Sequence, residues 1–226
     1  LPTSTDVEQL LEDLPLKSGS VWVDCTSGVP DSAQKLAVQL AERGVIFLDA
    51  PVSGQTIGAE NGTLTVMVGG NVQGYEHALP AMRAFGKLIK HVGESGAGFA
   101  VKAVNNMLMA VNLCAVAEGF TTLKAHGVNL HEALDCINAS SGKSMVTETV
   151  LPQRILNRSF PVTFALPLLA KDTGIAIDLA REAKLSAPVL SLTQNLIQAA
   201  SDLSDKNSDF SSAVKMYESW SNITIE

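Results

Sequence analysis

The stretch VWVDCTSGVPDSAQKLAVQLAERGVIFL, Val21 to Leu48, indicates the fold most directly. It begins with a strand-forming run, Val21 to Asp24, and ends with the apolar run Val45 to Leu48. Between them Pro30 opens a segment whose apolar residues recur every three or four positions, which predicts a helix that stops at Gly44. A strand, a crossing helix and a second strand are typical of a parallel sheet with helices packed across it.

The residues on either side extend this pattern. A short helix is predicted at Val7 to Leu14. Two further strands are predicted at Thr63 to Val68 and at Leu88 to Val92, both rich in β-branched or aliphatic residues. Between them Val72 to Phe85 is predicted to be helical, with Pro80 bending the helix or beginning a new segment.

The pattern changes after Gly98, because nearly every later segment has helical periodicity. Glycine and proline separate these segments from one another. We therefore place the domain boundary near Gly96 and expect two domains, residues 1–95 and residues 96–226. The predicted helices of the second domain are Phe99 to His126, His131 to Ala139, Thr147 to Leu156, Pro167 to Ala183, Val189 to Leu203 and Ser211 to Trp220.

Composition excludes several classes of partner. The chain has 226 residues, of which 46% are apolar, and a net charge of −7. A nucleic-acid partner would need a basic face, so this charge argues against one. The three cysteines are far apart in sequence and form no C-x-x-C pair, which favours reduced thiols inside a cell. The four histidines lack the spacing of metal ligands, and we expect no metal site.

No membrane partner is expected either. The longest apolar run, Met107 to Ala117, is interrupted by Asn112 and is shorter than the ~20 residues that a membrane span needs. Leu1 to Leu11 lacks the basic segment followed by an apolar one that marks a signal peptide. These features predict an intracellular protein, with the cytoplasm favoured and the mitochondrial matrix as the alternative.

Lys102 is the first candidate for chemistry. It lies among apolar residues in GAGFAVKAVNN, Gly96 to Asn106. A lysine in a helix is most often a solvated surface charge, and local sequence leaves that alternative open. A lysine held away from water can instead act as a general acid or base near neutral pH. Asn106 follows four residues later, so the two side chains share one helix face and can hold one substrate oxygen between them.

Two loops after predicted strands are further candidates. The segment Pro51 to Gly54 can present backbone N–H groups and the Ser53 hydroxyl to a carboxylate, although an ordinary turn would have the same composition. Thr26 follows the first strand, and ligands of open α/β sheets bind beyond the carboxyl ends of strands. The alternative for Thr26 is a capping role.

These two regions together resemble one family. DAPVSG, from Asp49 to Gly54, and the pattern G-x-G-x-x-x-K-x-x-N-N, from Gly96 to Asn106, are similar to the substrate loop and catalytic helix of the β-hydroxyacid dehydrogenases. That family includes 3-hydroxyisobutyrate dehydrogenase and tartronate semialdehyde reductase. The resemblance runs nearly end to end. It implies α/β followed by all-α: the later half of a Rossmann-type parallel sheet plus a C-terminal helical domain.

The resemblance also implies an activity and roles for substrate-site residues. The activity is the NAD- or NADP-dependent interconversion of a small β-hydroxyacid and its semialdehyde. Ser53 and Gly54 would bind the substrate carboxylate, and Lys102 would exchange a proton with the reacting oxygen. Asn106 would orient that oxygen, with Asn105 beside it in the substrate site. Gln55 would also contact substrate, and it stands where many family members carry a second glycine.

Cofactor contacts follow from the resemblance in the same way. Thr26 would contact the nicotinamide ribose region, and Leu1-Pro2 would make another contact. Gly98 would also lie at the cofactor. Lys171 would cover the nicotinamide end, although Lys171-Asp172 in an apolar helix is also what a structural ion pair would look like. Family members are oligomers, so we expect a homodimer or homotetramer.

No G-x-G-x-x-G motif occurs in the chain, so the turn that usually binds the pyrophosphate is absent. The simplest interpretation is that this chain is a fragment of a longer enzyme, inactive by itself. The alternative is a non-catalytic dimerising or ligand-binding module derived from such an enzyme. A purely helical scaffold would leave Lys102 and Asn106 on one apolar helix unexplained.

Overall fold

The chain forms two compact units, Leu1–Val104 and Asn105–Glu226, that divide within one long helix, α5 (Ala97–Ala125). The structure is a computed structural model, which describes residues 1–226 except for the side chains of Glu12 and Asp13. The boundary expected from the sequence, between residues 95 and 96, lies just before α5 begins and stays a prediction. Each unit is described separately below.

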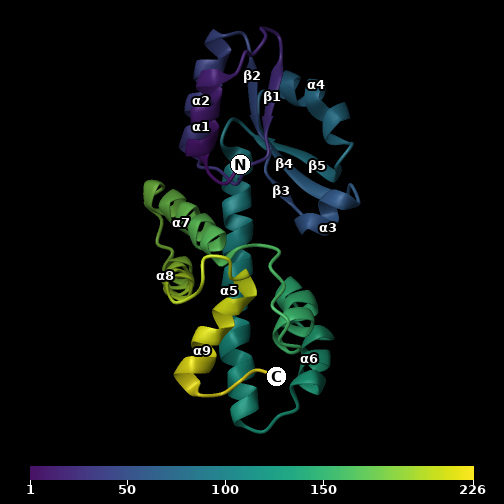
Figure 1. The fold of residues 1–226 in the computed structure, drawn as a ribbon, viewed down its shortest axis with the longest axis vertical. Helices are drawn as coiled ribbons and strands as arrows, with labels where there is room; N and C mark the ends of the chain where they lie inside the picture. Colours follow the sequence, from purple (N-terminus) through teal and green to yellow (C-terminus); the bar gives the residue numbers. More distant parts are fainter. The chain divides into compact units, whose positions relative to one another are not determined.

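Five strands form the sheet of the first unit (Figure 1). They are β1 (Val21–Asp24), β2 (Ile46–Asp49), β3 (Val52–Ser53), β4 (Leu64–Gly70) and β5 (Gly86–Gly93). Their order is β1-β2-β4-β3, and β5 pairs with β4. The pairs β1–β2 and β4–β5 are parallel, which confirms the strand–helix–strand interpretation of the sequence.

The sheet is parallel-rich but not wholly parallel. β4 runs antiparallel to both β2 and β3. After β2 the chain continues through β3 and the short helix α3 (Gln55–Glu60), then reverses at Gly62, where φ is +65°. The connection from Ser53 to Leu64 is shorter than the crossover of about a dozen or more residues that parallel pairing needs, so the two strands pair antiparallel. The sequence predicted neither β3 nor α3, because both are too short to show periodicity.

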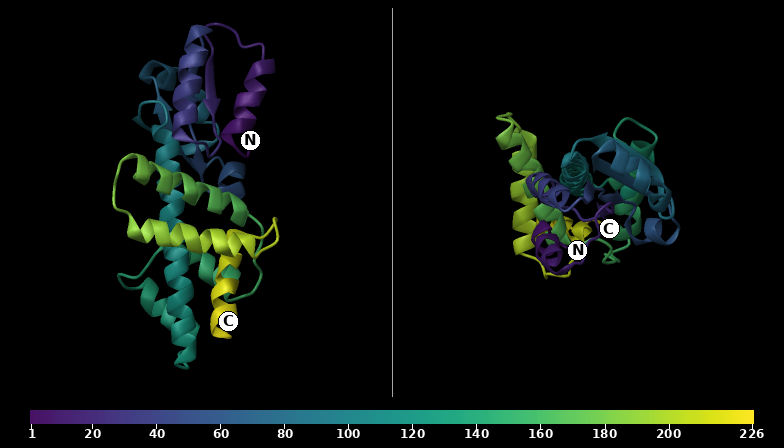
Figure 2. Two further views of the ribbon diagram at one scale, coloured as in Figure 1. Left: turned by 90° about the vertical axis from the view of Figure 1, so that its left-hand side faces the viewer. Right: turned by 90° about the horizontal axis from the view of Figure 1, so that it is seen from above.

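Helices cover both faces of this sheet (Figures 1 and 2). α1 (Ser4–Asp13) and α2 (Pro30–Glu42) lie on one face, and α4 (Val72–Met82), with Pro80 inside it, lies on the other. Successive residues of a strand point to opposite faces. Phe47 therefore packs in the cluster with α1 and α2, and Leu48 packs in the cluster with α4.

The second unit is all-helical, as the sequence predicts, and its core is built on the C-terminal part of α5. The helices α7 and α8 lie side by side (Figure 2). The elements after α5 are α6 (Leu130–Asn138), η1 (Val146–Ile155), α7 (Leu166–Glu182), α8 (Pro188–Asp202), η2 (Phe210–Ala213) and α9 (Val214–Ser221).

Two of these elements differ from a regular α-helix. η1 is a π-helix that contains Pro152, where an α-helix was expected. Proline has no N–H to donate and its ring clashes with the carbonyl four residues earlier, so a widened turn relieves both problems. The segment predicted as one helix from Ser211 to Trp220 is a 3₁₀ turn, η2, followed by α9.

α5 is long and apolar enough to cross a membrane by length and composition alone. In this structure 44% of its most apolar window is buried inside the protein. Met107, Ala110, Leu113 and Ala117, which recur every three or four positions, are each at most 1% exposed. Core helices of soluble proteins have the same character, so the helix is weak evidence for a membrane span.

Candidate functional site

The carboxyl ends of β1 and β2 lie next to each other in the first unit, because Asp24 and Asp49 are paired across the two parallel strands. Thr26 follows β1, and the Asp24 carboxylate accepts the Thr26 backbone N–H at 2.9 Å. The Ala50 N–H that follows β2 is donated to the Asp24 carbonyl oxygen at 2.7 Å. The loops that carry Thr26 and Ser53 therefore start from one edge of the sheet.

Thr26 has a buried hydroxyl. The residue is 6% exposed, and its Oγ1 has no hydrogen-bond partner among the described residues. Its backbone N–H, not its hydroxyl, makes the local bond to Asp24, so the capping alternative does not account for the side chain. A buried hydroxyl without a protein partner is costly, and a bound polar ligand would remove that cost.

The Ser53 loop has an unusual backbone. Ser53 pairs with Thr65 at the end of β3, Gly54 has φ +137°, and Gln55 has φ +58° at the start of α3. Both φ values lie in the range that favours glycine. A second glycine would fit the backbone at residue 55 better than glutamine does. Gln55 itself is exposed and directly follows Gly54 of the predicted carboxylate site.

Lys102 and Asn106 are one helical turn apart on α5, as the sequence predicts. Lys102 is partly buried and Asn106 is 4% exposed. The Asn106 amide is fixed from both ends. Its Nδ2 donates to Asp172 Oδ2 at 2.6 Å, and its Oδ1 accepts from Asn105 Nδ2 at 3.1 Å.

Lys171 and Asp172 come to this cluster from α7. Lys171 Nζ lies 3.3 Å from Asp172 Oδ1, so the ion pair that the sequence allowed does form. Asp172 is 1% exposed and bonds both Lys171 and the Asn106 amide. The sequence did not predict the second bond, because its partners are 66 residues apart. The available signal was a charged residue in an apolar helix, which needs a partner when buried.

The remaining predicted contacts lie elsewhere in the first unit. Leu1 and Pro2 are exposed and precede Thr3, which caps α1. Gly98 lies in the first turn of α5, where a Cβ would be 2.5 Å from the Asp49 carbonyl oxygen. Close packing alone therefore requires glycine at residue 98, and its cofactor contact stays a prediction.

Asp49 places a buried carboxylate at this edge of the sheet. Its carboxylate is 0% exposed and accepts hydrogen bonds from the N–H groups of Gly96 and Phe99 at 2.8 and 3.0 Å. Burial raises the pKa of Asp49, and these hydrogen bonds act in the opposite direction. Asp49 was not predicted as a site residue from the sequence.

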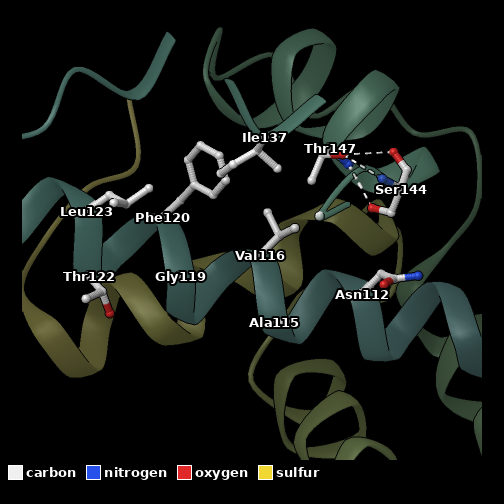
Figure 3. Close-up of a pocket in the computed structure, with 11 residues that line it drawn as sticks. Asn112, Ala115, Val116, Gly119, Phe120, Thr122, Leu123, Ile137, Ser144 and Thr147 are labelled. Atoms are coloured by element: carbon white, nitrogen blue, oxygen red, sulfur yellow. Dashed lines mark hydrogen bonds between the residues drawn. The ribbon is translucent and has the colours of Figure 1, made fainter. Parts of the chain in front are cut away.

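A cavity of about 420 Å³ lies in the second unit, away from the predicted site residues (Figure 3). Phe120 and Val116 of α5 and Ile137 of α6 line it with apolar surface. Ser144 and Thr147 also line it, but each donates its backbone N–H to the other's hydroxyl. The cavity therefore has little to offer a carboxylate. No group of three or more His, Cys, Asp or Glu side chains suited to a metal ion occurs in the part of the chain that the structure describes.

This fold and this arrangement define the class. A sheet edge with a buried free hydroxyl, a glycine-rich turn into a helix, and a Lys–Asn pair on that helix are features expected of a nicotinamide-dependent dehydrogenase. Family models agree. The NAD binding domain of 6-phosphogluconate dehydrogenase matches residues 1–93, and the model described as NAD-binding of NADP-dependent 3-hydroxyisobutyrate dehydrogenase matches residues 96–217.

Individual proteins agree with the family models. The chain is 35% identical to 2-(hydroxymethyl)glutarate dehydrogenase of Eubacterium barkeri, over 92% of this chain and 69% of that protein. It is 34% identical to NAD-dependent L-serine dehydrogenase of Pseudomonas aeruginosa, over 96% of this chain and 77% of that protein. The structure of Mycobacterium tuberculosis 3-hydroxyisobutyrate dehydrogenase with L-serine superimposes with a TM-score of 0.88 at 28% identity, over 96% and 77%. The chain belongs to the β-hydroxyacid dehydrogenase family, whose members are NAD- or NADP-dependent oxidoreductases.

The residues present fit one end of such a dinucleotide. The orphaned Thr26 hydroxyl lies at the sheet edge where nucleotides bind in open α/β sheets. Lys171, held by Asp172, is a cation with a side chain that is 26% exposed. Thr26 can donate to or accept from a ribose hydroxyl. The cofactor contact of Lys171, which belongs to the second unit, stays a prediction.

Proposed function

We propose that this protein interconverts a small β-hydroxyacid and its semialdehyde with NAD or NADP. The observation that carries the proposal is the fixed amide of Asn106, one helical turn from Lys102. An amide held by a buried carboxylate cannot rotate freely, so it offers substrate a fixed polar group beside an ammonium. Preorganised groups of this kind lower the barrier because they need no reordering during the reaction.

We assign the substrate class from chemistry that three relatives share. L-Serine, 3-hydroxyisobutyrate and 2-(hydroxymethyl)glutarate, which appear in their names, each carry a hydroxymethyl group on the carbon next to a carboxylate. Oxidation of that group gives a semialdehyde. A carboxylate anchor and a proton-transfer group are therefore what this protein's site must supply. Tartronate semialdehyde has the same arrangement and is a candidate in the reducing direction.

Each residue has one role in the proposed mechanism. Ser53 and the backbone at Gly54 bind the substrate carboxylate. As the neutral amine, Lys102 Nζ accepts the hydroxyl proton during oxidation, and as the ammonium it returns that proton during reduction, while Asn106 orients the same oxygen. Thr26 and Lys171 hold the dinucleotide, which when bound supplies the acceptor or donor of hydride.

Gln55, Asn105, Gly98 and the Leu1-Pro2 segment complete the proposed site. Gln55 extends the carboxylate loop, and we propose that it influences which side group the substrate carries. Asn105 supports the Asn106 amide through its Nδ2. Gly98 and Leu1-Pro2 are proposed cofactor contacts.

We infer that the protein works inside the cell, in the cytoplasm in preference to the mitochondrial matrix, as a homodimer or homotetramer. What supports an oligomer is the outer face of α5. Val101, Val104 and Leu108 are 41%, 44% and 55% exposed there and recur at helical spacing.

The test is turnover by the complete enzyme. L-Serine, 3-hydroxyisobutyrate and 2-(hydroxymethyl)glutarate are each offered with NAD⁺ and with NADP⁺, and formation of reduced cofactor is followed by absorbance. Tartronate semialdehyde is offered with NADH and with NADPH. Oxidation or reduction of at least one of them, reduced by roughly 10²-fold or more in Lys102→Ala, supports the proposal. Binding of these acids without turnover would favour a ligand-binding module instead.

A further inference from the structure

The first turn of α5 is capped by a residue from a distant part of the chain. The first N–H groups of any helix lack partners inside it. Here Gly96 N–H donates to Asp49 Oδ1 at 2.8 Å, and Phe99 N–H donates to Asp49 Oδ2 at 3.0 Å. One carboxylate thus uses both oxygens to hold the start of a helix that lies 47 residues away in sequence.

The backbone packs so closely around the Asp49 carboxylate that a residue larger than glycine would not fit at residues 69 and 98. A Cβ at Gly69 would lie 2.6 Å from Asp49 Oδ1 and 2.8 Å from the Gly98 nitrogen. A Cβ at Gly98 would lie 2.9 Å from Asp49 Oδ2. Gly96 has φ +95°, which only glycine adopts without strain. Three glycines therefore bring backbone directly against one side chain.

The negative charge of Asp49 is stabilised by backbone N–H groups. No salt bridge to Asp49 occurs between the side chains that the structure describes. The partners of the carboxylate are backbone N–H groups at a helix N-terminus, where the peptide dipoles favour a negative charge. Neutralising the side chain would therefore weaken its hold on α5 without releasing a buried cation.

Asp49 also stands at the start of the predicted carboxylate loop. It is the last residue of β2, and Ser53 follows four residues later. Phe99, which it binds, precedes Lys102 by three residues on α5. Asp49 therefore links the start of the carboxylate loop to the turn of α5 that precedes Lys102.

We propose that Asp49 is a positioning residue for the reaction, which fixes Lys102 relative to the Ser53–Gly54 loop by capping α5. This inference rests on the proposed function of Lys102. A displacement of about 1 Å in a reacting group can reduce turnover about 10²-fold. Asp49 touches neither substrate nor cofactor in this account, and its effect passes through the helix.

The test compares Asp49→Asn and Asp49→Ser with wild type in the complete enzyme. Asparagine keeps the size but turns one acceptor into a donor that faces an N–H group, and serine keeps one capping oxygen. We expect kcat to fall about 10²-fold in Asp49→Asn and less in Asp49→Ser. KM should change much less than kcat, because the carboxylate loop itself is intact.

Leu40→Ala is the matched control. Leu40 is 1% exposed in the core of the same unit, in the cluster that also contains Phe99, and its truncation lowers stability without removing a hydrogen bond of Asp49. It should keep kcat near wild type. If Leu40→Ala lowers kcat as much as Asp49→Asn does, the effect of Asp49 is general destabilisation and the proposal is wrong.

Two measurements are independent of turnover. In wild type, the amides of Gly96 and Phe99 should exchange slowly with deuterium, and exchange should accelerate from Gly96 to Lys102 in Asp49→Asn. The rate at which acetic anhydride modifies Lys102, followed by mass spectrometry, should change in parallel. If the amides of Gly96 and Phe99 in wild type exchange as fast as those of an unfolded peptide, the cap does not form and the proposal is wrong. This result needs only the wild-type enzyme, so it holds even if neither variant folds.

These measurements also separate this inference from the proposed function. Wild-type enzyme that turns over none of the candidate substrates contradicts the proposed function, whereas slow amide exchange would still establish the cap. Wild-type kcat in Asp49→Asn, with accelerated exchange at Phe99, would contradict the positioning role alone.

Discussion

At the scale of single residues, Gln55 shows a conflict between backbone and side chain. Its φ of +58° lies in the left-handed region, which costs an L-residue roughly 1–2 kcal/mol. We predict that Gln55→Gly raises the free energy of unfolding by about 0.5–1 kcal/mol, after the greater flexibility of glycine in the unfolded chain is deducted. Urea denaturation measures the change.

The control for Gln55 is Gln39→Gly. Gln39 is exposed in the middle of α2, where glycine should cost about 1 kcal/mol relative to a good helix former. We expect Gln55→Gly to raise the free energy of unfolding and Gln39→Gly to lower it. Destabilisation by both would mean that the contacts of the Gln55 side chain outweigh the strain of its backbone.

Sequence could identify some site residues and not others. Lys102 and Asn106 were predicted because four residues on a helix is a local relation. Asp49 and Asp172 act on partners 47 and 66 residues away, and only the folded chain brings these together. The free hydroxyl of Thr26 was equally hidden, since composition cannot tell which polar atoms a loop satisfies.

At the scale of elements, the sequence again predicts features that depend on neighbouring residues and misses those that depend on the folded chain. The strands and helices with clear periodicity were predicted with small shifts at their ends. The two-residue strand β3 and the short helix α3 were not, because both are too short to show periodicity. The antiparallel direction of β4 was not predicted either, because it depends on how the chain folds back between Ser53 and Leu64. The π-helix η1 could not be distinguished from an α-helix by composition.

A buried ion pair holds three elements of the second unit together. Asp209, before η2, accepts N–H groups from Thr163 and Phe164 before α7 and lies 3.1 Å from Arg154 of η1. Burial raises the pKa of Asp209, but hydrogen bonds from Ser211, Thr163 and Phe164 outweigh it, so the pKa is lowered overall. The network therefore favours the ionised carboxylate.

This lowered pKa predicts a pH dependence. A carboxylate whose pKa is lower in the folded state stabilises the fold above its unfolded pKa, about 3.9, and loses that contribution as pH falls through its folded pKa. Asp209→Asn should cost about 3–5 kcal/mol at neutral pH, because Arg154 stays buried without its counterion. The difference from wild type should shrink in urea titrations below about pH 4.

The exposed pair Arg181–Asp178 provides the comparison. Both side chains are more than half exposed, so Asp178→Asn should change stability by about 0.5 kcal/mol or less. A loss as small as this for Asp209→Asn would mean that the buried network does not stabilise the second unit.

At the scale of the whole molecule, α5 belongs to both units and exposes an apolar face. We predict that the protein self-associates through this face and sediments as a dimer or tetramer. Leu108→Lys should shift it toward monomer, because a charge in an apolar contact is costly to bury. Val38→Lys, at an apolar site on α2 that is 65% exposed, should have no such effect. Monomeric wild type at high micromolar concentration would contradict this prediction.

The proton-transfer role of Lys102 is the central claim. Lys102→Ala should reduce turnover of the complete enzyme by roughly 10²–10⁴-fold, the range for loss of a positioned acid or base. Binding of the substrate carboxylate should change less, because Ser53 and Gly54 are separate contacts.

The most direct test replaces the lysine by arginine, which keeps the charge but cannot release its proton near neutral pH. Steady-state kinetics across pH are measured for wild type, Lys102→Ala and Lys102→Arg. The account predicts that Lys102→Arg is as impaired as Lys102→Ala. Turnover near wild type in Lys102→Arg would show that Lys102 acts only through its charge, and would contradict the mechanism.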